Sequence, residues 1–232
     1  MKAGIIAAGR GERLIKGGVL IPKPLIQVNN EPLIARMIRA AHHVGVSSIA
    51  CIVNDLDTGV ADYLRSSSWP VPLELVVKTT PSSMESLFSL APLLRDEPFL
   101  LLTVDSIFEF EALRGFVAKA HRLKGDGALA VTSFVDDEKP LWVRFDKNQK
   151  IVALGDKARP TQYITSGFYY FNPDIFSLIY AARAKRLNAL REFLGFLLEG
   201  GFNLYAVHVS KTIDIDYPED IKKAQRYLER IG

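Results

Sequence analysis

A loop near the start of the chain has the residue types that bind phosphate groups. The apolar run at residues 3–8 leads directly into Gly9, Arg10, Gly11, Glu12 and Arg13. Small residues and glycines after a strand let the backbone bend and approach a ligand closely. Backbone N–H groups exposed in such a loop can cradle phosphate oxygens. The sequence therefore predicts a phosphate-binding backbone at the end of the first strand.

Two well-known phosphate-binding motifs do not match this loop. A dinucleotide-binding fingerprint requires a third glycine at the position of Leu14. A P-loop requires Gly-Lys-Ser/Thr, whereas the chain has Gly17, Gly18 and Val19. A Gly-x-Gly pair alone is a weak signal, because most such pairs are simple turns.

Two cations that follow the glycines make the prediction of a phosphate-binding site more specific. Arg13 comes two residues after Gly11, and Lys23 lies ten residues further on, between Pro22 and Pro24. A polyphosphate needs fixed positive charge along its length, and arginine can bind it through two parallel hydrogen bonds. The prolines would fix the chain beside Lys23. Without this context, either cation alone is more typical of a solvated surface charge.

Acidic residues occur after one predicted strand and before the last predicted helix, and the first of them is a candidate for ligand binding. Asp105 follows the apolar run at residues 99–104, and open α/β sheets bind ligands at the carboxyl ends of their strands. The alternative for Asp105 is a turn or helix cap. Asp214 and Asp216 lie just before the last predicted helix, whose first turn contains Pro218.

The pattern of the chain predicts an α/β fold with three layers, a Rossmann-like sheet that is mixed but mainly parallel, and helices on both faces. Residues 127–171 interrupt the alternation with four strand-like runs, so we expect a smaller lobe facing the second substrate. A single domain spanning residues 1–232 is expected. Strands are expected at residues 3–8, 48–53, 73–77, 99–104, 127–134, 141–145, 150–154, 164–171 and 203–208. Helices are expected at residues 32–45, 58–66, 84–95, 109–124, 173–182, 186–199 and 218–230.

Composition excludes several classes of protein. With 48% hydrophobic and 24% charged residues, the chain can bury a core and is not intrinsically disordered. The net charge of +3 comes without basic runs, so no nucleic-acid partner is expected. Cys51, the single cysteine, lies in an apolar run and is expected to be a buried hydrophobe. No apolar stretch reaches the ~18–20 residues of a membrane span, and a cytoplasmic location is the default expectation.

The loop and its cations together resemble the sugar nucleotidyltransferase family. The family signature is Ala-Ala-Gly-x-Gly-x-Arg followed after about ten residues by Pro-Lys, and the chain matches it at residues 7–13 and 22–23. The continuation at residues 24–34 and the segment 44–49 are also similar to that family. The chain differs at Lys16 and Gly18, where the family often has Pro and Thr.

The resemblance implies roles for particular residues. It implies that Arg13 and Lys23 are catalytic and that Asp105 and Asp214 bind Mg²⁺. Asp216 stands where the family usually has glycine, which leaves open which of the two later carboxylates binds the metal. Lys157 and Gly167 are implied to bind the acceptor. The residues implied to bind the nucleotide are Ala7, Ala8, Gly9, Gly11, Arg13, Lys23, Glu85 and Ser86.

The activity that the resemblance implies is transfer of a nucleoside monophosphate from an NTP to a small phosphorylated acceptor, with release of pyrophosphate. A sugar 1-phosphate is the expected acceptor. One alternative is a phosphocholine-type cytidylyltransferase, in which Trp142, Tyr163 or Tyr169 would hold a quaternary ammonium. Another is a non-catalytic nucleotide-binding protein of the same fold. A glycosyltransferase is disfavoured, because Asp105 lacks a second acid two residues later. The base, the acceptor and the oligomeric state stay open.

Overall fold

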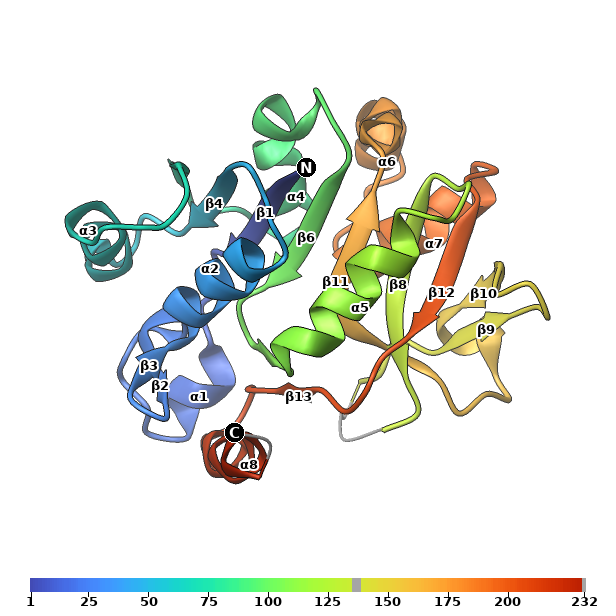
Figure 1. Ribbon diagram of the computed structural model, residues 1–232. Coiled ribbons are helices and arrows are strands. Elements are labelled where there is room, and N and C mark those ends of the chain that lie inside the picture. Colours follow the sequence, from blue (N-terminus) through green and yellow to red (C-terminus); the bar gives the residue numbers. More distant parts are fainter. Residues whose placement is uncertain (135–138, 231–232) are drawn as a thin grey trace.

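A seven-stranded sheet forms the centre of the computed structural model, which describes residues 1–134 and 139–230 (Figure 1). The order of the strands is β12-β8-β11-β6-β1-β4-β5. Their bounds are β1 Lys2–Ala7, β4 Ile49–Val53, β5 Leu73–Val77, β6 Phe99–Thr103, β8 Gly127–Thr132, β11 Ile164–Phe171 and β12 Leu204–His208.

Six of these seven strands run in the same direction. β1 pairs in parallel with β4 and β6, β4 with β5, and β12 with β8. β11 is reversed and lies antiparallel between β6 and β8. The expected mixed, mainly parallel sheet is confirmed. The carboxyl ends of the parallel strands and the amino end of β11 therefore meet at one edge of the sheet.

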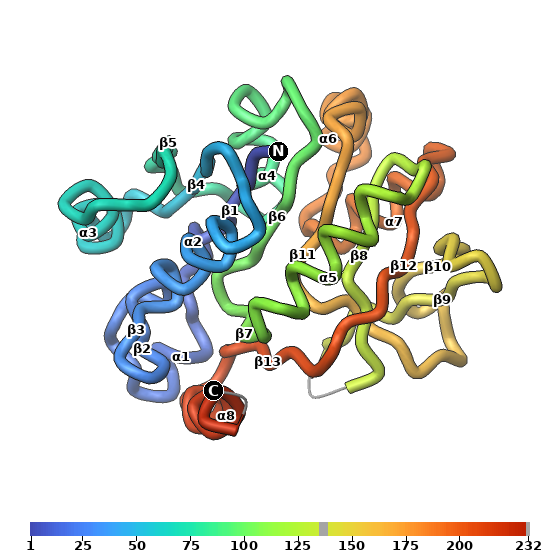
Figure 2. Tube along the Cα trace, in the orientation of Figure 1, coloured from blue at the N-terminus to red at the C-terminus, as the bar shows by residue number. Residues whose placement is uncertain are grey.

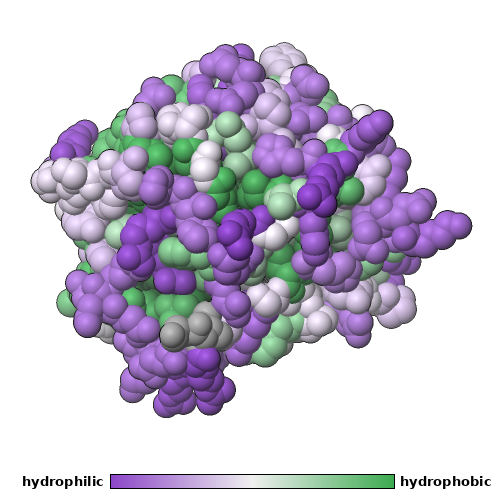
Figure 3. All heavy atoms as spheres, viewed as in Figure 1, coloured by the Kyte–Doolittle hydropathy of each residue, from purple (hydrophilic) through white to green (hydrophobic). Residues whose placement is uncertain are grey.

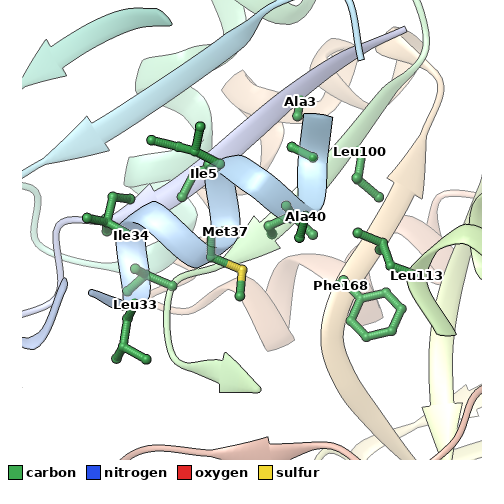
Figure 4. Packing of buried hydrophobic residues seen from close by; sticks show 14 of the residues in the cluster. Ala3, Ile5, Leu33, Ile34, Met37, Ala40, Leu100, Leu113 and Phe168 are labelled. Carbon is green, nitrogen blue, oxygen red and sulfur yellow. The ribbon is translucent and has the colours of Figure 1, made fainter. Parts of the chain in front are cut away.

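Helices cover both faces of this sheet, which confirms the three layers (Figure 1). Successive side chains of β1 point to opposite faces of the sheet. Ile5 belongs to the hydrophobic cluster under α2 and α5, whereas Ile6 belongs to the cluster under α4 and α7. Figure 4 shows the first cluster, to which a helix contributes Met37 and strand β11 contributes Phe168. The helices are α1 Glu12–Lys16, α2 Leu33–His43, α3 Thr58–Ser66, α4 Ser83–Leu94, α5 Phe110–Ala120, α6 Ile179–Ala184, α7 Leu190–Glu199 and α8 Pro218–Glu229.

Short elements complete the chain. Residues 127–171 were expected to form a smaller lobe, but β8 and β11 join the central sheet, and only the hairpin of β9 and β10 stands apart, beside β12 (Figure 2). Two further pairs, β2 with β3 and β7 with β13, are each two residues long. The bounds are β2 Gln27–Val28, β3 Glu31–Pro32, β7 Ser106–Ile107, β9 Val143–Phe145, β10 Ile151–Leu154 and β13 Ile213–Asp214, with 3-10 helices η1 Lys23–Leu25, η2 Gly155–Ala158 and η3 Pro173–Leu178.

The structure differs from the sequence prediction mainly where the chain changes direction. The helix expected at residues 173–182 is a 3-10 turn, η3, followed by the short α6. The helix expected from residue 186 begins only at Leu190, because Arg186 adopts a positive φ of 56°. The short α1 was not expected, since its five residues give no readable periodicity.

Polar side chains cover most of the face that carries α2 and α5, with hydrophobic patches between them (Figure 3). Within residues 1–134 and 139–230, no helix is both long and apolar enough to cross a bilayer.

Candidate active site

A cleft with two adjoining cavities opens at the edge where the parallel strands end. The large cavity has a volume of about 690 Å³, and the small cavity has a volume of about 300 Å³. They are parts of one cleft because they share five lining residues, which are Arg13, Ser83, Thr103, Asp105 and Asp216. Of the residues implied by resemblance, the large cavity is also lined by Ala8, Gly9, Gly11, Lys23 and Ser86, and the small cavity by Gly167 and Asp214.

The loop after β1 is shaped by Gly11, which has a positive φ of 64°. A Cβ atom on Gly11 would lie 3.2 Å from the Cβ of Lys23, which is closer than side chains normally pack. Glycine therefore serves both the left-handed backbone and the close approach of the loop to Lys23. The loop residues Ala8, Gly9 and Arg10 line the large cavity, whereas Ala7 is buried in β1 and lines neither cavity.

Lys23 lies at the centre of the charged part of the cleft. Its side chain is only 9% exposed, and Pro22 and Pro24 flank it in the short η1 turn. Its Nζ donates to Asp105 Oδ2 at 2.8 Å and to Asp216 Oδ1 at 2.9 Å. Burial lowers the pKa of the Lys23 ammonium, but the two carboxylates raise it above the ordinary lysine value. Lys23 is therefore a fixed positive charge at neutral pH.

Asp105 is held by the same ion pair. Burial raises the pKa of its carboxyl, but the charge and hydrogen bond of Lys23 outweigh burial and hold the pKa below its ordinary value. The carboxyl group stays ionised at neutral pH. The sequence prediction that Asp105 ends a buried strand beside the glycine loop is thus matched by its position after β6.

Arg13 and Asp216 form a second charged pair in the cleft. Arg13 Nη1 donates to Asp216 Oδ2 at 3.0 Å, and its guanidinium lies 5.4 Å from the centre of the Tyr217 ring. About a third of each of these two side chains is exposed, so solvent screens the pair. Asp216 therefore bridges Arg13 and Lys23, and both cations are partly neutralised in this state.

The pairing of β7 with β13 brings Asp214 to the cleft. β7 and β13 lie side by side (Figure 2), with Asp214 opposite Ser106 in this two-residue ladder. The buried Ser106 Oγ donates to Asp214 Oδ1 at 2.7 Å. The N–H of Ile215 also donates to the Asp105 carbonyl oxygen at 3.1 Å. These contacts join segments that are 108 residues apart in sequence. They hold Asp105 and Asp214 at the same small cavity.

The start of α8 fixes the neighbouring residue Asp216. Asp220 is buried, and its Oδ2 accepts from the N–H groups of Asp216 at 3.2 Å and Tyr217 at 2.9 Å. A carboxylate at this position also favours the positive end of the helix. The acidic residues that the sequence placed at the start of the last helix thus position Asp216 in the cleft.

The carboxylates of the small cavity fit a hard divalent cation. Asp105, Asp214 and Asp216 all line this cavity, and carboxylate oxygens are the ligands that Mg²⁺ prefers. Among the described residues, no group of three or more His, Cys, Asp or Glu side chains is arranged to hold a metal ion. A site with one or two protein carboxylates is nevertheless typical for Mg²⁺, which takes its other ligands from water and substrate phosphates.

The segment before α4 forms the other rim of the large cavity. Ser82 caps the helix by accepting from the Glu85 N–H at 3.2 Å, and Ser86 Oγ lies 2.7 Å from Thr80 Oγ1. Glu85 itself points to α6, where its carboxylate accepts from Arg183 at 2.8 and 2.7 Å. Ser86 thus lines the cavity as expected, whereas Glu85 lines neither cavity.

Gly167 and Tyr169 on the reversed strand β11 form the floor of the small cavity. Gly167 has a positive φ of 75°, and a Cβ there would overlap Ser106 Oγ. Gly167 therefore makes room for the serine that holds Asp214. Tyr169 is buried, which raises the pKa of its hydroxyl to about 12.

Lys157 is not brought to the cleft. It lies in η2, the turn after β10, and its 85% exposed side chain pairs with Glu199 at 3.7 Å. It lines neither cavity. The turn geometry directs it toward the end of α7, which the sequence alone did not reveal.

The aromatic residues considered for an ammonium cage do not converge. Tyr169 lines the small cavity, but Trp142 stacks under the guanidinium of Arg159 at 4.7 Å. Tyr163 packs instead against Phe145 and His208. One aromatic ring at the cavity is not a cage, so the geometry gives no specific support to a quaternary ammonium acceptor.

Comparison with known proteins agrees with this arrangement. The profile of a protein family described as nucleotidyl transferase matches residues 2–230. The chain belongs to the nucleotidyl transferase family. Its resemblance to sugar nucleotidyltransferases is thereby confirmed.

Relatives within the nucleotidyl transferase family fall into two groups by length. A mannose-1-phosphate guanyltransferase of Emericella nidulans is 27% identical over 77% of this chain and 51% of its own length. A mannose-1-phosphate guanylyltransferase catalytic subunit beta of Dictyostelium discoideum is 31% identical over 77% of this chain and 52% of its own. The chain thus spans about half the length of these relatives. A UTP–glucose-1-phosphate uridylyltransferase of Haloferax volcanii is 24% identical over 99% of this chain and 97% of its own.

Solved structures share the fold at low identity. The inositol-1-phosphate CTP transferase from T. maritima has a TM-score of 0.80 and 20% identity, over 99% of this chain and 95% of its own. A UDP-glucose pyrophosphorylase in complex with UDP-glucose has a TM-score of 0.82 and 16% identity, over 100% of this chain and 99% of its own. Both comparisons support the fold of a nucleotidyl transferase.

Three residues of this nucleotidyl transferase cleft were not predicted. Ser106 holds Asp214, and Lys139 and Arg191 line the small cavity. The sequence gives only a weak indication that Ser106 belongs to the site, because it follows Asp105 directly and is polar within an apolar run. Lys139 and Arg191 carry no sequence signal, since each is one of many cations in a polar segment.

Proposed function

We propose that the protein transfers a nucleoside monophosphate from an NTP to a small phosphorylated acceptor of the sugar 1-phosphate class. The observation that carries the proposal is the charged junction between the two cavities. There, Arg13 and Lys23 lie beside Asp105, with Asp214 on the adjoining cavity wall. Phosphoryl chemistry needs this combination of fixed cations and metal-binding carboxylates.

The two cavities divide naturally between the two substrates. The large cavity contains the glycine loop and the hydroxyl-rich rim from Thr79 to Ser83, which suit a triphosphate and a base. The small cavity has a polar lining and a volume suited to a compact acceptor. The shared residues Arg13 and Asp105 would then lie where the reacting phosphates meet.

The reaction that follows is an in-line attack of an acceptor phosphate oxygen on the α-phosphorus of the NTP. The new P–O bond forms as the bond from the α-phosphorus to the bridging oxygen breaks, and pyrophosphate leaves. The attacking oxygen is anionic near neutral pH, so no general base is required. The barrier consists mainly of charge repulsion and misalignment, which positioning and fixed cations reduce.

Each cation has a distinct task in this proposal. Lys23 stabilises the negative charge that builds up at the α-phosphate, because its pKa keeps it protonated. Arg13 binds the β- and γ-phosphates and stabilises the departing pyrophosphate. Both cations must exchange their contacts with Asp216 for contacts with phosphate, which makes Asp216 a placeholder for the nucleotide.

Asp105 and Asp214 are the residues that would hold Mg²⁺, and Ser106 would orient the second of them. When bound, the ion supplies Lewis acidity and a template for the phosphate oxygens. The family resemblance assigns the second ligand to Asp214, and a comparison of Asp214 and Asp216 variants tests this choice.

The proposed acceptor class follows from the relatives. Their names refer to mannose 1-phosphate, glucose 1-phosphate and inositol 1-phosphate, which all present a phosphate beside ring hydroxyl groups. The polar small cavity suits such a molecule, since Thr103 and Thr165 supply hydroxyl groups and the carboxylates can accept from substrate hydroxyl groups.

The proposal is tested with a panel of the four ribonucleoside triphosphates and dTTP against these three phosphates and phosphocholine. The reaction is followed by pyrophosphate release in the presence of Mg²⁺, and the product is identified by mass spectrometry. We expect one or a few combinations to give pyrophosphate and a diphosphate-linked product. Orthophosphate release would indicate a hydrolase, and the complete lack of turnover would favour a nucleotide-binding protein without catalysis.

A further inference from the structure

The two edges of the central sheet are finished differently. At one edge, the hairpin of β9 and β10 reaches β12, where the Ala206 N–H donates to the Gln149 carbonyl oxygen at 2.8 Å. At the other edge, β5 pairs with β4 and with no other strand of residues 1–134 and 139–230. Figure 2 shows β5 and α3 on the opposite side of the molecule from that hairpin. An uncovered edge strand presents a row of backbone groups with which another strand can pair.

The hydrogen bonds between β5 and β4 show which backbone groups of β5 face the open edge. The Pro72 carbonyl oxygen accepts from an N–H group of β4 at 2.9 Å, and the Lys78 N–H donates to a carbonyl oxygen of β4 at 2.8 Å. The even-numbered residues from Pro72 to Lys78 therefore turn their N–H and C=O groups toward β4. Because backbone groups alternate along a strand, Leu75 and Val77 turn theirs toward the open edge.

The apolar side chains of β5 also suit contact with another strand. Leu73, Leu75 and Val77 are partly buried and pack against the same hydrophobic cluster as α3. Leu73 and Leu75 line a groove of about 310 Å³ beside α3, together with Leu64 and Trp69. A strand that continues the sheet beyond β5 would extend this apolar surface.

Two opposite charges lie on the other face of β5. Glu74 and Lys78 are both exposed, and they share this face with Val76, which lies midway between them. Within residues 1–134 and 139–230, neither charged side chain forms an ion pair. Exposed charges protect an edge strand when a partner would meet them with like charge. A strand with an acid and a base at equal distances from its centre is instead complementary to an antiparallel copy of itself.

An antiparallel pair centred on Val76 brings all of these features into register. Leu75 lies opposite the partner's Val77, and both turn their N–H and C=O groups toward each other, which gives a hydrogen-bonded pair. Glu74 lies opposite the partner's Lys78 in a non-hydrogen-bonded pair, where side chains approach most closely. Both contacts occur twice, because the pairing is symmetric. A centre on Glu74 would place two glutamates opposite each other, and a centre on Leu75 would place Glu74 opposite a valine.

We propose that two copies of the chain associate through β5, in an antiparallel pair about a two-fold axis at Val76. The axis is perpendicular to the sheet, so the two central sheets continue into one, and the grooves beside both copies of α3 lie on the same face. A ladder over residues 74–78 is short compared with a permanent dimer interface, so the association is weak and reversible. The association is independent of the proposed function, because none of these residues lines the cleft.

Sedimentation velocity at protein concentrations from about 1 to 500 µM tests the association, because weak interfaces dissociate in the micromolar to millimolar range. The variants are Glu74→Lys, Lys78→Glu and the double variant that carries both changes. Lys147→Glu is the matched control, since Lys147 is an exposed lysine in the turn between β9 and β10. Thermal melting verifies that each variant folds.

The wild type is expected to dimerise as its concentration rises. Glu74→Lys and Lys78→Glu should each weaken the association by about 10-fold or more, because two like-charged pairs replace two pairs of opposite charge. The double variant restores opposite charges and should dimerise as the wild type does. An equimolar mixture of the two single variants should form a heterodimer, because every pair across that interface is again of opposite charge. Lys147→Glu should match the wild type.

Amide hydrogen exchange locates the interface on the backbone. The N–H groups of Leu75 and Val77 should exchange more slowly as the protein concentration rises, because they become hydrogen-bonded only in the dimer. The Val76 N–H faces β4 in every state, so its exchange should not depend on concentration.

Any one of three results would overturn the proposed association through β5. The first is a wild type that stays monomeric at the highest concentration. The second is a dimer that Glu74→Lys and Lys78→Glu weaken no more than Lys147→Glu does. The third is a dimer in which the exchange of Leu75 and Val77 is the same as in the monomer. Each of them leaves the proposed transferase activity intact, because that activity is measured separately.

Discussion

The two walls of the cleft differ in how their charges are balanced. On the inner wall, which consists of Arg13, Lys23, Asp105 and Asp216, every charge has an opposite partner from a distant segment. On the outer wall, formed by residues 139–141 and 189–191, Arg191 is oriented by a carbonyl oxygen rather than by a carboxylate.

This difference indicates that the inner wall is preorganised for the reaction, whereas the outer wall is suited to binding a ligand. The inner wall holds its charges in place before any ligand arrives, and such fixed charges lower the barrier of a reaction without reorganising. The outer wall offers a charge that no carboxylate of residues 1–134 and 139–230 balances. We therefore expect changes in the inner wall to lower kcat, and changes in the outer wall to raise the acceptor KM.

The largest effect is expected from the two proposed metal-binding carboxylates, Asp105 on the inner wall and Asp214 in the adjoining small cavity. Asp105→Asn and Asp214→Asn should each lower kcat by about 10²–10³-fold, by analogy with the loss of one preorganised electrostatic contact. The control is Asp62→Asn on the exposed face of α3, which should match the wild type. Turnover close to the wild-type rate in either cleft variant would remove that residue from the metal site.

The floor between the two walls gives the next largest effect. Gly167→Ala places a methyl group on Ser106 Oγ at a positive φ, so Ser106 must leave Asp214. We expect a destabilisation of about 1–3 kcal/mol and a clear loss of kcat.

Gly115→Ala on α5 is the matched control for the floor, because a Cβ there meets no neighbouring atom and alanine favours a helix. Thermal melting and kcat measured on both variants distinguish the site from the substitution itself. Equal behaviour of the two glycine variants would show that Gly167 does not set the cleft.

A smaller effect is expected for Asp216 on the inner wall. Asp216→Asn weakens the contacts with Arg13 and Lys23. The pair with Arg13 is more than a third exposed and contributes ~1 kcal/mol or less, and the buried Lys23 keeps its second partner, Asp105. We expect a loss of kcat well below that of Asp214→Asn, as measured in the same assay. A loss as large as that of Asp214→Asn would instead make Asp216 the second metal-binding carboxylate.

The smallest effect is expected at Glu85, behind the cleft. Hydrogen bonds from Arg183 lower the pKa of Glu85, so the pair stabilises the fold at neutral pH and loses its effect as the pH falls through that lowered pKa. Arg183 is about half exposed, so Glu85→Gln should cost less than ~1 kcal/mol.

Melting curves at neutral and acid pH test this prediction for Glu85. The difference in Tm between wild type and Glu85→Gln should shrink toward zero in acid, and the NTP KM should stay unchanged. A raised NTP KM in this variant would restore Glu85 to the nucleotide site.

The inner wall could largely be located from the sequence because its determinants are local. A strand that ends in small residues and glycines must form a loop at the sheet edge, and an apolar strand that ends in Asp105 must present that residue at the same edge. The catalytic and metal-binding roles of these residues stay predictions that the assays above test.

The outer wall could not be predicted, because it depends on where elements begin and turn. Residues 186–199 were expected to form one helix, which would have placed Arg191 in its interior. The positive φ of Arg186 delays the helix to Leu190 and moves Arg191 into the first turn, facing the cavity. Lys157 was expected at the site but lies outside it, since no local feature of the sequence predicts that η2 directs its side chain away from the cleft.

The two-residue pairing of β7 with β13 also determines when the cleft can form during folding. Contacts between residues this far apart in sequence close slowly, because a long loop must be ordered before they form. While the chain is being synthesised, Lys23 and Asp105 can meet once β1 and β6 are paired. Asp214, 108 residues after Ser106, can join them only after the segment that contains β13 has left the ribosome. The proposed metal site would therefore be completed late, after the sheet that supports it has begun to form.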